Sequence, residues 1–590
     1  MCGIAGSLSF HAQTPRDAVQ RMVDAMASRG PDAEGLWQHD WVTFGHRRLG
    51  IIDLSERGRQ PMVDEDLGLA LVFNGCIYNH VELRAELSAD FSFRSTSDTE
   101  VILKAYAKWG DDLVDHLHGM FAFALFDQRR NRVLLARDRL GVKPLYLAGV
   151  DGSLRFASSL PALLAGGGVD TAIDPVGLHH YLSWHSIVPA PRTILRGVTK
   201  LPPATVMVVE ADGTRHQREY WHVDYSRDPD RADWSAEDWE EAVLDSLRGA
   251  VRRHLVADVP VGVLLSGGLD SSMLVALADE VATEPLDTFT IGFESVGSQA
   301  GDEFAYSDVI AERFGTRHQR IRVSNAELAE AVPRAVAAMT EPMASHDVTA
   351  FYLLSQFTAQ STKVVQSGQG ADEVFGGYSY HQSAAHADHV DALAVFEDAF
   401  RDYTHDQVQR MVTPQLAVAS DVSHHLLDSA MQRPGAQTAT DAVLRLDTHL
   451  LMPDDPVKRV DSMSMAWGLE ARVPFLDHEL VELAAACPPE LKAAEDGKGI
   501  LKQVGRRIMP SAVIDRPKGY FPVPGLRTLG GPVLEQLRDL LGSQAARERG
   551  IIRDNVREAM LQDPNGMLDR RGGNTLWSLA VLEMWLQEHV

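Results

Sequence analysis

The segment "VPVGVLLSGGLDSSMLVALADEVA", residues 259–282, runs from an apolar stretch through a glycine-containing loop into a stretch of helical pattern. The apolar stretch predicts a buried strand, and the loop predicts an anion site at the start of a helix. Adjacent glycines, Gly267 and Gly268, let backbone N–H groups approach a polyphosphate closely, and the serine hydroxyls add donors. A glycine-rich turn with no ligand is the plainer alternative. A second acidic loop, "SGQGADE", which also follows an apolar stretch, favours the phosphate site.

Two details of this loop define the kind of phosphate site. The spacing GxxxxGK[ST] is absent, so the loop is not a Walker P-loop. Asp270 would repel a phosphate unless a divalent cation lay between them. The sequence therefore predicts Mg²⁺ on the β- and γ-phosphates and bond breaking at the α-phosphate.

Two further apolar stretches also end in loops: "LDTFTIGFE" (286–294) and "TKVVQSGQGADEVFGGY" (362–378). Strands that alternate with helical stretches predict an α/β domain with a mainly parallel sheet. In such a sheet ligands bind beyond the carboxyl ends of the strands, where these loops lie.

The first 150 residues have a different pattern. Short β-type stretches such as "LALVFNGCIYN" (69–79) alternate with helical ones such as "DTEVILKAYAKWG" (98–110), which predicts antiparallel sheets covered by helices. A closing hairpin is expected with its turn at Asp212-Gly213, followed by a polar linker over 224–238. These features predict two domains, residues 2–223 and residues 233–590.

Composition and charge narrow the class of protein. A chain of 590 residues is too long for one core. Its 56 Lys and Arg against 82 Asp and Glu give a net charge of −26, which argues against nucleic acid and anionic membranes as partners. The longest apolar runs fall far short of the ~20 residues that span a membrane. Three cysteines and the lack of a signal-peptide pattern predict a cytoplasmic protein.

Cys2 stands directly behind the initiator methionine. Chance placement of a small buried hydrophobe is one explanation. The other is that removal of Met1 makes Cys2 the first residue, so that its α-amino group, of pKa ~7.7–8.0, can serve as a tethered base for its thiol.

Several motifs decide between these explanations. In the first 150 residues they are "RGPD" (29–32), "GHRRLGIIDLS" (45–55), "FNGCIYN" (73–79), "SDTE" (97–100) and "RDRLGVKPLY" (137–146). This set resembles the class II, N-terminal nucleophile glutaminases. Together with the glycine loop, "SGQGADEVFGGY" (367–378) and "MSMAWGLEARVPFLD" (463–477), it resembles the glutamine-hydrolysing asparagine synthetases over nearly the whole chain.

The resemblance implies a fold for each half. The first is an α+β sandwich of αββα layers, the N-terminal nucleophile fold. The second is an α/β PP-loop ATP pyrophosphatase domain with a mainly parallel sheet. Small-molecule partners are implied (glutamine, ATP and a carboxylate acceptor), and a homodimer is left open.

In the first half the resemblance implies a glutamine site. Cys2 would attack the glutamine carboxamide, and Asn74 with the Gly75 N–H would stabilise the oxyanion. Arg48 would bind the α-carboxylate of glutamine and Asp98 its α-ammonium. The remaining implied glutamine-binding residues are Ile51 and Ile52.

In the second half the resemblance implies adenylation of a carboxylate by ATP with Mg²⁺, followed by attack of ammonia that arrives through an internal tunnel. Asp270 and Asp372 would hold the metal. Lys502 would neutralise charge on the α-phosphate, with Lys498 as a weaker companion. The implied ATP-binding residues are Leu265, Ser266, Gly267, Gly268, Asp270, Ser271, Ile291, Ser367 and Gly368.

Two positions depart from the family pattern. Gln369 replaces a usual glutamate and cannot accept a proton, so the base that deprotonates ammonia is open among Glu341, His346 and Asp347. Cys76 also replaces a usual glutamate, and packing is favoured over catalysis for its thiol.

The acceptor is inferred from other stretches. Several stretches resemble the bacterial N-acetylglutaminylglutamine amidotransferases more closely than the asparagine synthetases proper. They are "FNGCIYN" (73–79), "ASSLPALLAGGGVD" (157–170), residues 451–484 and "IDRPKGYFPVPGL" (514–526). Aspartate is the alternative acceptor. A catalytically silent sensor and a glutaminase serving phosphoribosyl chemistry are disfavoured by the retained nucleophile and by the glycine loop.

One group of three histidines could be interpreted as a metal site. His381, His386 and His389 lie in a helical stretch, residues 380–400. Their irregular spacing favours a solvated helix face instead.

Overall fold

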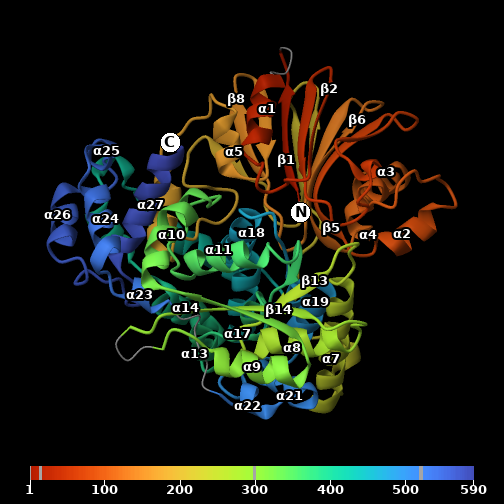
Figure 1. Ribbon diagram of the computed structural model, residues 1–590. Helices are drawn as coiled ribbons and strands as arrows, with labels where there is room; N and C mark the ends of the chain where they lie inside the picture. The colour runs from red at the N-terminus through yellow and green to blue at the C-terminus, as the bar shows by residue number, and fades with distance from the viewer. Residues whose placement is uncertain (1, 12–15, 297–299, 517–522) are drawn as a thin grey trace.

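The structure is a computed structural model that describes residues 2–11, 16–296, 300–516 and 523–590 (Figure 1). Met1 and part of the segment "IDRPKGYFPVPGL" lie outside the described residues.

The N-terminal half contains two six-stranded sheets whose strands pair antiparallel. The first has the order β10-β8-β9-β1-β3-β2, and the second has the order β12-β11-β7-β6-β5-β4. The strands are β1 (Gly3–Ser9), β2 (Ala33–His39), β3 (Val42–Arg48), β4 (Met62–Asp64), β5 (Leu69–Ile77), β6 (Gly119–Asp127), β7 (Arg132–Arg137), β8 (Tyr146–Val150), β9 (Ser153–Ala157), β10 (Val198–Lys200), β11 (Thr205–Glu210) and β12 (Arg215–Glu219).

Alternating side chains of these strands build separate cores on the two faces of each sheet. Val72 of β5 packs between the sheets with Phe44 of β3, whereas Phe73 faces the other way. The outer face of the second sheet is covered by α2 (His80–Leu87) and α3 (Asp98–Trp109). The outer face of the first sheet is covered by α1 (Arg16–Asp24), α5 (Leu160–Ala165) and α6 (Pro175–Ser183). The layers are therefore helix, sheet, sheet, helix.

The C-terminal half is built on a five-stranded sheet of order β15-β14-β13-β16-β17, whose strands all pair parallel. Its strands are β13 (Val261–Leu264), β14 (Asp287–Phe293), β15 (Arg317–Val323), β16 (Val364–Gln366) and β17 (Glu470–Arg472). Val263 packs with α8 on one face, whereas Phe289 packs with α11 on the other. The predicted order of antiparallel sheets first and a parallel sheet second is confirmed.

Helices surround the parallel sheet and form the rest of this half (Figure 1). Those of seven residues or more are α7 (Ala236–Arg253), α8 (Leu269–Asp279), α9 (Phe304–Arg313), α10 (Asn325–Ala337), α11 (Asp347–Thr358), α13 (Ser379–Ala385), α14 (Ala392–Phe400), α15 (His405–Met411), α16 (Val422–Met431), α17 (Ala439–Leu446), α18 (Pro456–Met465), α19 (His478–Ala486), α21 (Gly499–Ile508), α24 (Gly531–Gly542), α26 (Asp554–Gln562) and α27 (Thr575–His589). None of the helices within the described residues is both long and apolar enough to cross a lipid bilayer.

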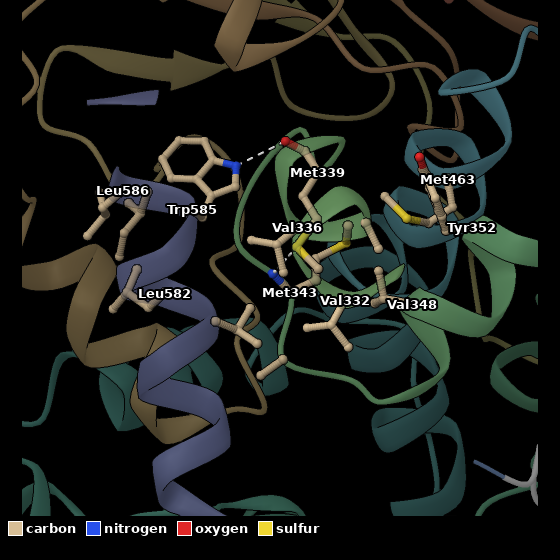
Figure 2. Close-up of a cluster of buried hydrophobic side chains, with 14 of the residues drawn as sticks. Val332, Val336, Met339, Met343, Val348, Tyr352, Met463, Leu582, Trp585 and Leu586 are labelled. Carbon is tan, nitrogen blue, oxygen red and sulfur yellow. Dashed lines mark hydrogen bonds between the residues drawn. The ribbon is translucent and has the colours of Figure 1, made fainter. Parts of the chain in front are cut away.

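The last helix, α27, is held against α10 by a buried apolar cluster (Figure 2). Trp585 and Leu582 of α27 pack with Val332 and Val336 of α10. The Trp585 indole N–H donates to the Met339 carbonyl at 3.0 Å, so the polar edge of this buried ring is satisfied.

Buried ion pairs join the two halves. Asp461 of α18 accepts from Arg29 at 3.0 Å and from Lys143 at 3.2 Å, and all three side chains are buried. Lys200 of β10 contacts Glu341 at 2.9 Å. Because an unpaired buried charge is costly, these contacts fix the two halves against each other.

Two local predictions, the hairpin turn and the solvated histidines, can be compared with the structure. The hairpin turn lies at Asp212-Gly213 between β11 and β12, as predicted. The solvated histidine face is wrong for His381, which is buried with its Nε2 3.0 Å from Asp447, whereas His386 and His389 are exposed.

Candidate functional site

A pocket at the junction of the two halves contains Cys2 and is called the Cys2 pocket. Most residues predicted for the glutamine site line it, together with residues of the C-terminal half. The lining residues are Cys2, Arg48, Leu49, Ile51, Ile52, Gly58, Gln60, Phe73, Gly75, Cys76, Ser97, Asp98, Thr99, Glu470 and Arg472.

Cys2 lies directly before β1 and is buried. Its backbone N–H donates to the Asn74 side-chain oxygen at 2.9 Å. Burial raises the pKa of the Cys2 thiol, although a backbone hydrogen bond from Leu49 and the charge of Arg48 act to lower it. The thiol is therefore protonated at neutral pH and requires a base before it can attack a substrate.

Asn74 and Gly75 of β5 lie beside Cys2. The Asn74 side-chain nitrogen is buried and has no hydrogen-bond partner among the described residues. A Cβ at Gly75 would lie 2.1 Å from the Met120 carbonyl oxygen of β6, so only glycine fits this close approach of strands. The Asn74 amide therefore leaves a hydrogen-bond donor beside the nucleophile, which is what a developing oxyanion requires.

Arg48 and Asp98 place opposite charges in the same pocket. The Arg48 guanidinium donates to the carbonyl oxygens of Asp53 and, at 2.9 Å, of Ser55. Asp98 is the first residue of α3 and accepts the Ile77 N–H at 3.1 Å. Burial raises the pKa of the Asp98 carboxyl, while His80 counteracts this. A free amino acid carries an α-carboxylate that could pair with Arg48 and an α-ammonium that could pair with Asp98. The pocket is therefore suited to bind an amino acid.

Glu470 and Arg472 of β17 complete the Cys2 pocket from the C-terminal half, and sequence reasoning did not assign them to it. The Arg472 guanidinium donates to Glu470 at 2.6 Å and to the carbonyl of His254 at 2.9 Å. Burial opposes ionisation of Glu470, but nearby positive charge, including that of Arg472, lowers the pKa of its carboxyl to about 2. Both residues belong to the segment "MSMAWGLEARVPFLD", which was the available signal.

Cys76 is buried in the wall of the same pocket. Its sulfur accepts from the Arg472 guanidinium at 3.5 Å, and burial raises the pKa of its thiol well above the ordinary value. A neutral thiol held by an arginine agrees with the packing role favoured from sequence.

A second cavity lies at the carboxyl ends of β13, β14 and β16 and is called the glycine-loop cavity. It brings together the predicted ATP-binding residues from three loops. Its lining residues are Leu264, Leu265, Ser266, Asp270, Ser271, Phe289, Thr290, Ile291, Phe351, Leu354, Ser367, Gly368, Gln369 and Asp372.

The glycine loop is held in one shape by its own hydrogen bonds. The Ser266 hydroxyl lies 3.0 Å from the Ser271 hydroxyl and accepts the Gly268 N–H at 3.2 Å. Gly267 has φ +74°, and a Cβ there would lie 2.5 Å from the backbone nitrogen of Ser307. The loop therefore requires glycine at position 267, and it leads directly into the first residue of α8, Leu269.

Asp270 and Asp372 converge on a single cation. The Lys498 ammonium lies 2.7 Å from Asp270 and 2.9 Å from Asp372. Burial opposes the charge of Lys498, but the two carboxylates raise the pKa of its ammonium above the ordinary value. Two hard carboxylate oxygens that already share one positive charge fit the donor set that Mg²⁺ prefers.

The structure does not bring Lys502 to these carboxylates. Its ammonium donates to the carbonyl of Glu495, and burial lowers its pKa. Lys498, named from the sequence only as the weaker companion, is the lysine in contact with both acids.

The candidates for the base in the second half lie outside the residues that line the glycine-loop cavity. Glu341 is buried and accepts from Tyr146 at 3.0 Å as well as from Lys200. Asp347 is paired with Arg459 at 3.1 Å. His346 precedes α11, and its ring lies 5.2 Å from that of Trp577 in a tilted arrangement.

One residue links the two cavities. The Arg472 side chain lines the Cys2 pocket, while its backbone carbonyl accepts the Ser367 N–H of the glycine-loop cavity at 2.8 Å. A smaller cavity beside it is lined by residues of both halves, among them Tyr78, Met120 and Val473.

Comparisons with known proteins agree with this arrangement. Residues 242–587 match the family model for asparagine synthase, and residues 1–221 match that for a glutamine amidotransferase domain. The glutamine-hydrolysing asparagine synthetase 3 of Bacillus subtilis (strain 168) is 33% identical over 543 residues, or 88% of this chain and 87% of that protein. Asparagine synthetase 1 of the same organism is 29% identical over 630 residues, 99% of this chain and 96% of that protein. Asparagine synthetase B of Escherichia coli (strain K12) is 31% identical over 543 residues, 88% of this chain and 82% of that protein.

Proposed function

The chain belongs to the glutamine-hydrolysing asparagine synthetase family, and on that premise we propose how its two cavities divide the reaction. The protein is a carbon–nitrogen ligase that takes its amide nitrogen from glutamine. We assign glutamine hydrolysis to the Cys2 pocket and ATP-dependent activation of an acceptor carboxylate to the glycine-loop cavity. The observation that supports this assignment is that Arg472 lines the Cys2 pocket and accepts a hydrogen bond from Ser367 of the glycine-loop cavity, so one residue contacts both proposed sites.

In the Cys2 pocket we assign attack on the glutamine carboxamide to the Cys2 thiol. Removal of Met1 would give Cys2 a free α-amine, and the Asn74 oxygen that accepts the Cys2 N–H would orient it as the base. The Asn74 side-chain nitrogen and the Gly75 N–H would stabilise the oxyanion. Arg48 and Asp98 would bind the α-carboxylate and α-ammonium of glutamine, with Ile51 and Ile52 lining the pocket.

In the glycine-loop cavity we assign the ATP phosphates to the loop from Leu265 to Ser271, with Ser367, Gly368 and Ile291 around the nucleotide. Asp270 and Asp372 would hold Mg²⁺, and ATP supplies the leaving group that activates the acceptor carboxylate. Lys498, rather than Lys502, would neutralise the charge that develops on the α-phosphate, because it alone of the two contacts the acids.

We keep residues 2–223 and 233–590 as the proposed units. The end of β12 at Glu219 and the start of α7 at Ala236 support this division. The helix–sheet–sheet–helix layers support the N-terminal nucleophile fold for the first unit. The parallel sheet with its glycine loop supports the PP-loop ATP pyrophosphatase fold for the second.

For the acceptor we propose the carboxylate of N-acetylglutaminylglutamine, with aspartate as the alternative. The support is the sequence resemblance of residues 157–170 and 451–484, together with the departures at Gln369 and Cys76. We expect the purified enzyme, given ATP, Mg²⁺ and glutamine, to release AMP when the dipeptide is added. AMP release with aspartate but not with the dipeptide would make aspartate the preferred acceptor and contradict the proposal.

Glu470 is expected to set the pH dependence of glutamine hydrolysis. A carboxylate beside Cys2 stabilises a protonated amine and disfavours a thiolate, so it raises the pKa of both groups. Changing Glu470 to Gln keeps an acceptor for Arg472 but removes the negative charge. The rising limb of the pH profile of kcat/KM for glutamine should therefore move to lower pH by roughly half a unit or more. Glu558→Gln, at an exposed position on α26, is the control, and an unmoved profile in Glu470→Gln would contradict this role.

A further inference from the structure

A group of metal-ligating side chains lies outside both cavities, where α6 of the N-terminal half meets α15 and α16 of the C-terminal half. His179 of α6, His405 of α15 and Asp421, which caps α16, each bring one ligand atom close to the other two. The three ligand atoms lie within 4.8 Å of one another. His179 Nε2 is 3.1 Å from His405 Nδ1, a close approach of two imidazole nitrogens.

The buried member of this group is oriented from behind. His179 is 1% exposed, and its Nδ1 lies 2.7 Å from the Ser423 hydroxyl. The same hydroxyl lies 2.9 Å from His180 Nδ1. If His179 donates from Nδ1 and Ser423 donates to His180, all three groups are satisfied, and His179 Nε2 keeps its lone pair for a ligand. This pattern, in which the far nitrogen of a histidine is fixed by a hydrogen bond, is typical of metal sites.

The protonation state agrees with that orientation. Burial, together with the neighbouring His405 and Arg401, lowers the pKa of His179 to about 4. The imidazole is therefore neutral at physiological pH, which is the form that binds metal ions.

Asp421 supplies the negative charge. Its Oδ2 accepts from Arg401 at 2.7 Å, whereas its Oδ1 caps α16 through the His424 N–H at 3.0 Å and accepts a longer contact from Arg401 at 3.4 Å. An ionised carboxylate oxygen has two lone pairs, so Oδ2 can take a further partner. Arg401 is shared with Glu397, 2.5 Å away. Two carboxylates and one guanidinium leave one net negative charge beside the two imidazoles.

We propose that His179, His405 and Asp421 bind one zinc ion, with the fourth position open to water. Two imidazoles and a carboxylate are a common zinc donor set. Because α6 belongs to the first half and α15 and α16 to the second, the bound ion would fasten the two halves together at a point distant in sequence from either cavity. The proposal does not depend on the assignment of glutamine or ATP.

A second cluster with ligating atoms, formed by His118, His478 and Glu479, fits a metal ion less well. Glu479 is paired with Arg253 at 2.8 Å, and the charge of Arg139 acts on both histidines. Arginine also pairs with Asp421 in the first cluster, so burial and orientation separate the two. Glu479 is exposed and neither histidine of the second cluster is buried, and among the described residues neither shows a hydrogen bond that would fix its far nitrogen.

The test measures metal binding by the full-length protein without substrates. The chain is stripped with a chelator, incubated with zinc chloride and separated from free metal by gel filtration, and bound zinc is counted by mass spectrometry. We expect one tightly held zinc per chain. Cobalt(II) in its place should give the visible absorption of a four-coordinate site.

Two ligand variants and one control locate the ion. His405→Ala removes a ligand, and Asp421→Asn removes the charge while keeping a residue that caps helices well. Each should weaken zinc binding by more than the 10–100-fold that loss of an outer hydrogen bond costs, whereas His425→Ala, at an exposed position on α16, should not. Zinc should also raise the melting temperature of the wild type but not of His405→Ala.

Two results would overturn the proposal. One is a wild-type chain that retains no stoichiometric zinc. The other is zinc that stays in His405→Ala and Asp421→Asn but is lost from His118→Ala, which would assign the ion to the second cluster.

Discussion

Changing Cys2 to Ala should lower glutamine-dependent amide formation by roughly 10⁴-fold or more, because the pocket then has no nucleophile. Synthesis from added ammonium salt should remain, since the glycine-loop cavity is built from residues 264–372, which the change does not touch. The measurement is AMP release with glutamine and, separately, with ammonium chloride as nitrogen donor.

Cys487→Ala is the matched control for Cys2→Ala. Its thiol is also buried, but it lies at the end of α19 and lines neither cavity. It should keep both activities. Loss of the ammonium-dependent activity in Cys2→Ala would contradict two separable sites. Mass spectrometry of active enzyme that still carries Met1 would contradict the role of the free α-amine.

Lys498→Gln should lower amide formation from either nitrogen donor by roughly 10²–10³-fold, the usual cost of removing one group that stabilises transition-state charge. Glutamine keeps most of the length of lysine and can still donate a hydrogen bond to Asp270 or Asp372, so the change removes mainly the charge. Glutamine hydrolysis should remain, which also reports that the protein is folded. Pyrophosphate release in the presence of ATP, Mg²⁺ and acceptor is the direct measurement.

Lys502→Gln is the matched comparison for Lys498→Gln. The two lysines lie four residues apart, but the Lys502 ammonium donates to the backbone carbonyl of Glu495 and does not contact Asp270 or Asp372. It should have a much smaller effect. If Lys502→Gln lost amide formation while Lys498→Gln kept it, the assignment taken from sequence resemblance would be the better one.

The sequence located what depends on local pattern. A strand, a glycine loop and a helix follow one another in residues 259–282, and the structure has β13, that loop and α8 in this order. Gly267 was named from its glycine loop and Gly75 from the family resemblance, and in the structure each occupies a place where a side chain would collide with backbone. The linear order of the motifs was enough to predict antiparallel sheets before a parallel one.

The sequence resemblance ranked Lys502 above Lys498, and the local pattern could not test that order, since residues four apart lie on the same side of a regular helix. Lys498 has φ +55° and precedes the first residue of α21, so it leaves the helical pattern and turns towards Asp270. The flanking glycines, Gly497 and Gly499, permit this departure from the helix, but they do not specify the direction in which the lysine side chain turns.

Contacts between distant segments were also missed. Arg472 meets Cys76 across 396 positions, and His179 meets His405 across 226. Motif spacing predicts neither pairing, because the way in which two halves dock depends on their complete surfaces. The segment around Glu470 was noted from the sequence, but only docking decides that it closes a pocket belonging to the other half.

The position of β17 bears on how such enzymes can be recombined. A strand of the ligase half supplies one wall of the compartment in which the amide is cleaved. If the first half were excised, the Cys2 pocket would be exposed to bulk water. In a chimera that joins this half to a different ligase, the residues that replace Glu470 and Arg472 would not match the rest of the pocket. Exchange of modules should therefore succeed only when residues 470–472 travel with the N-terminal segment they serve.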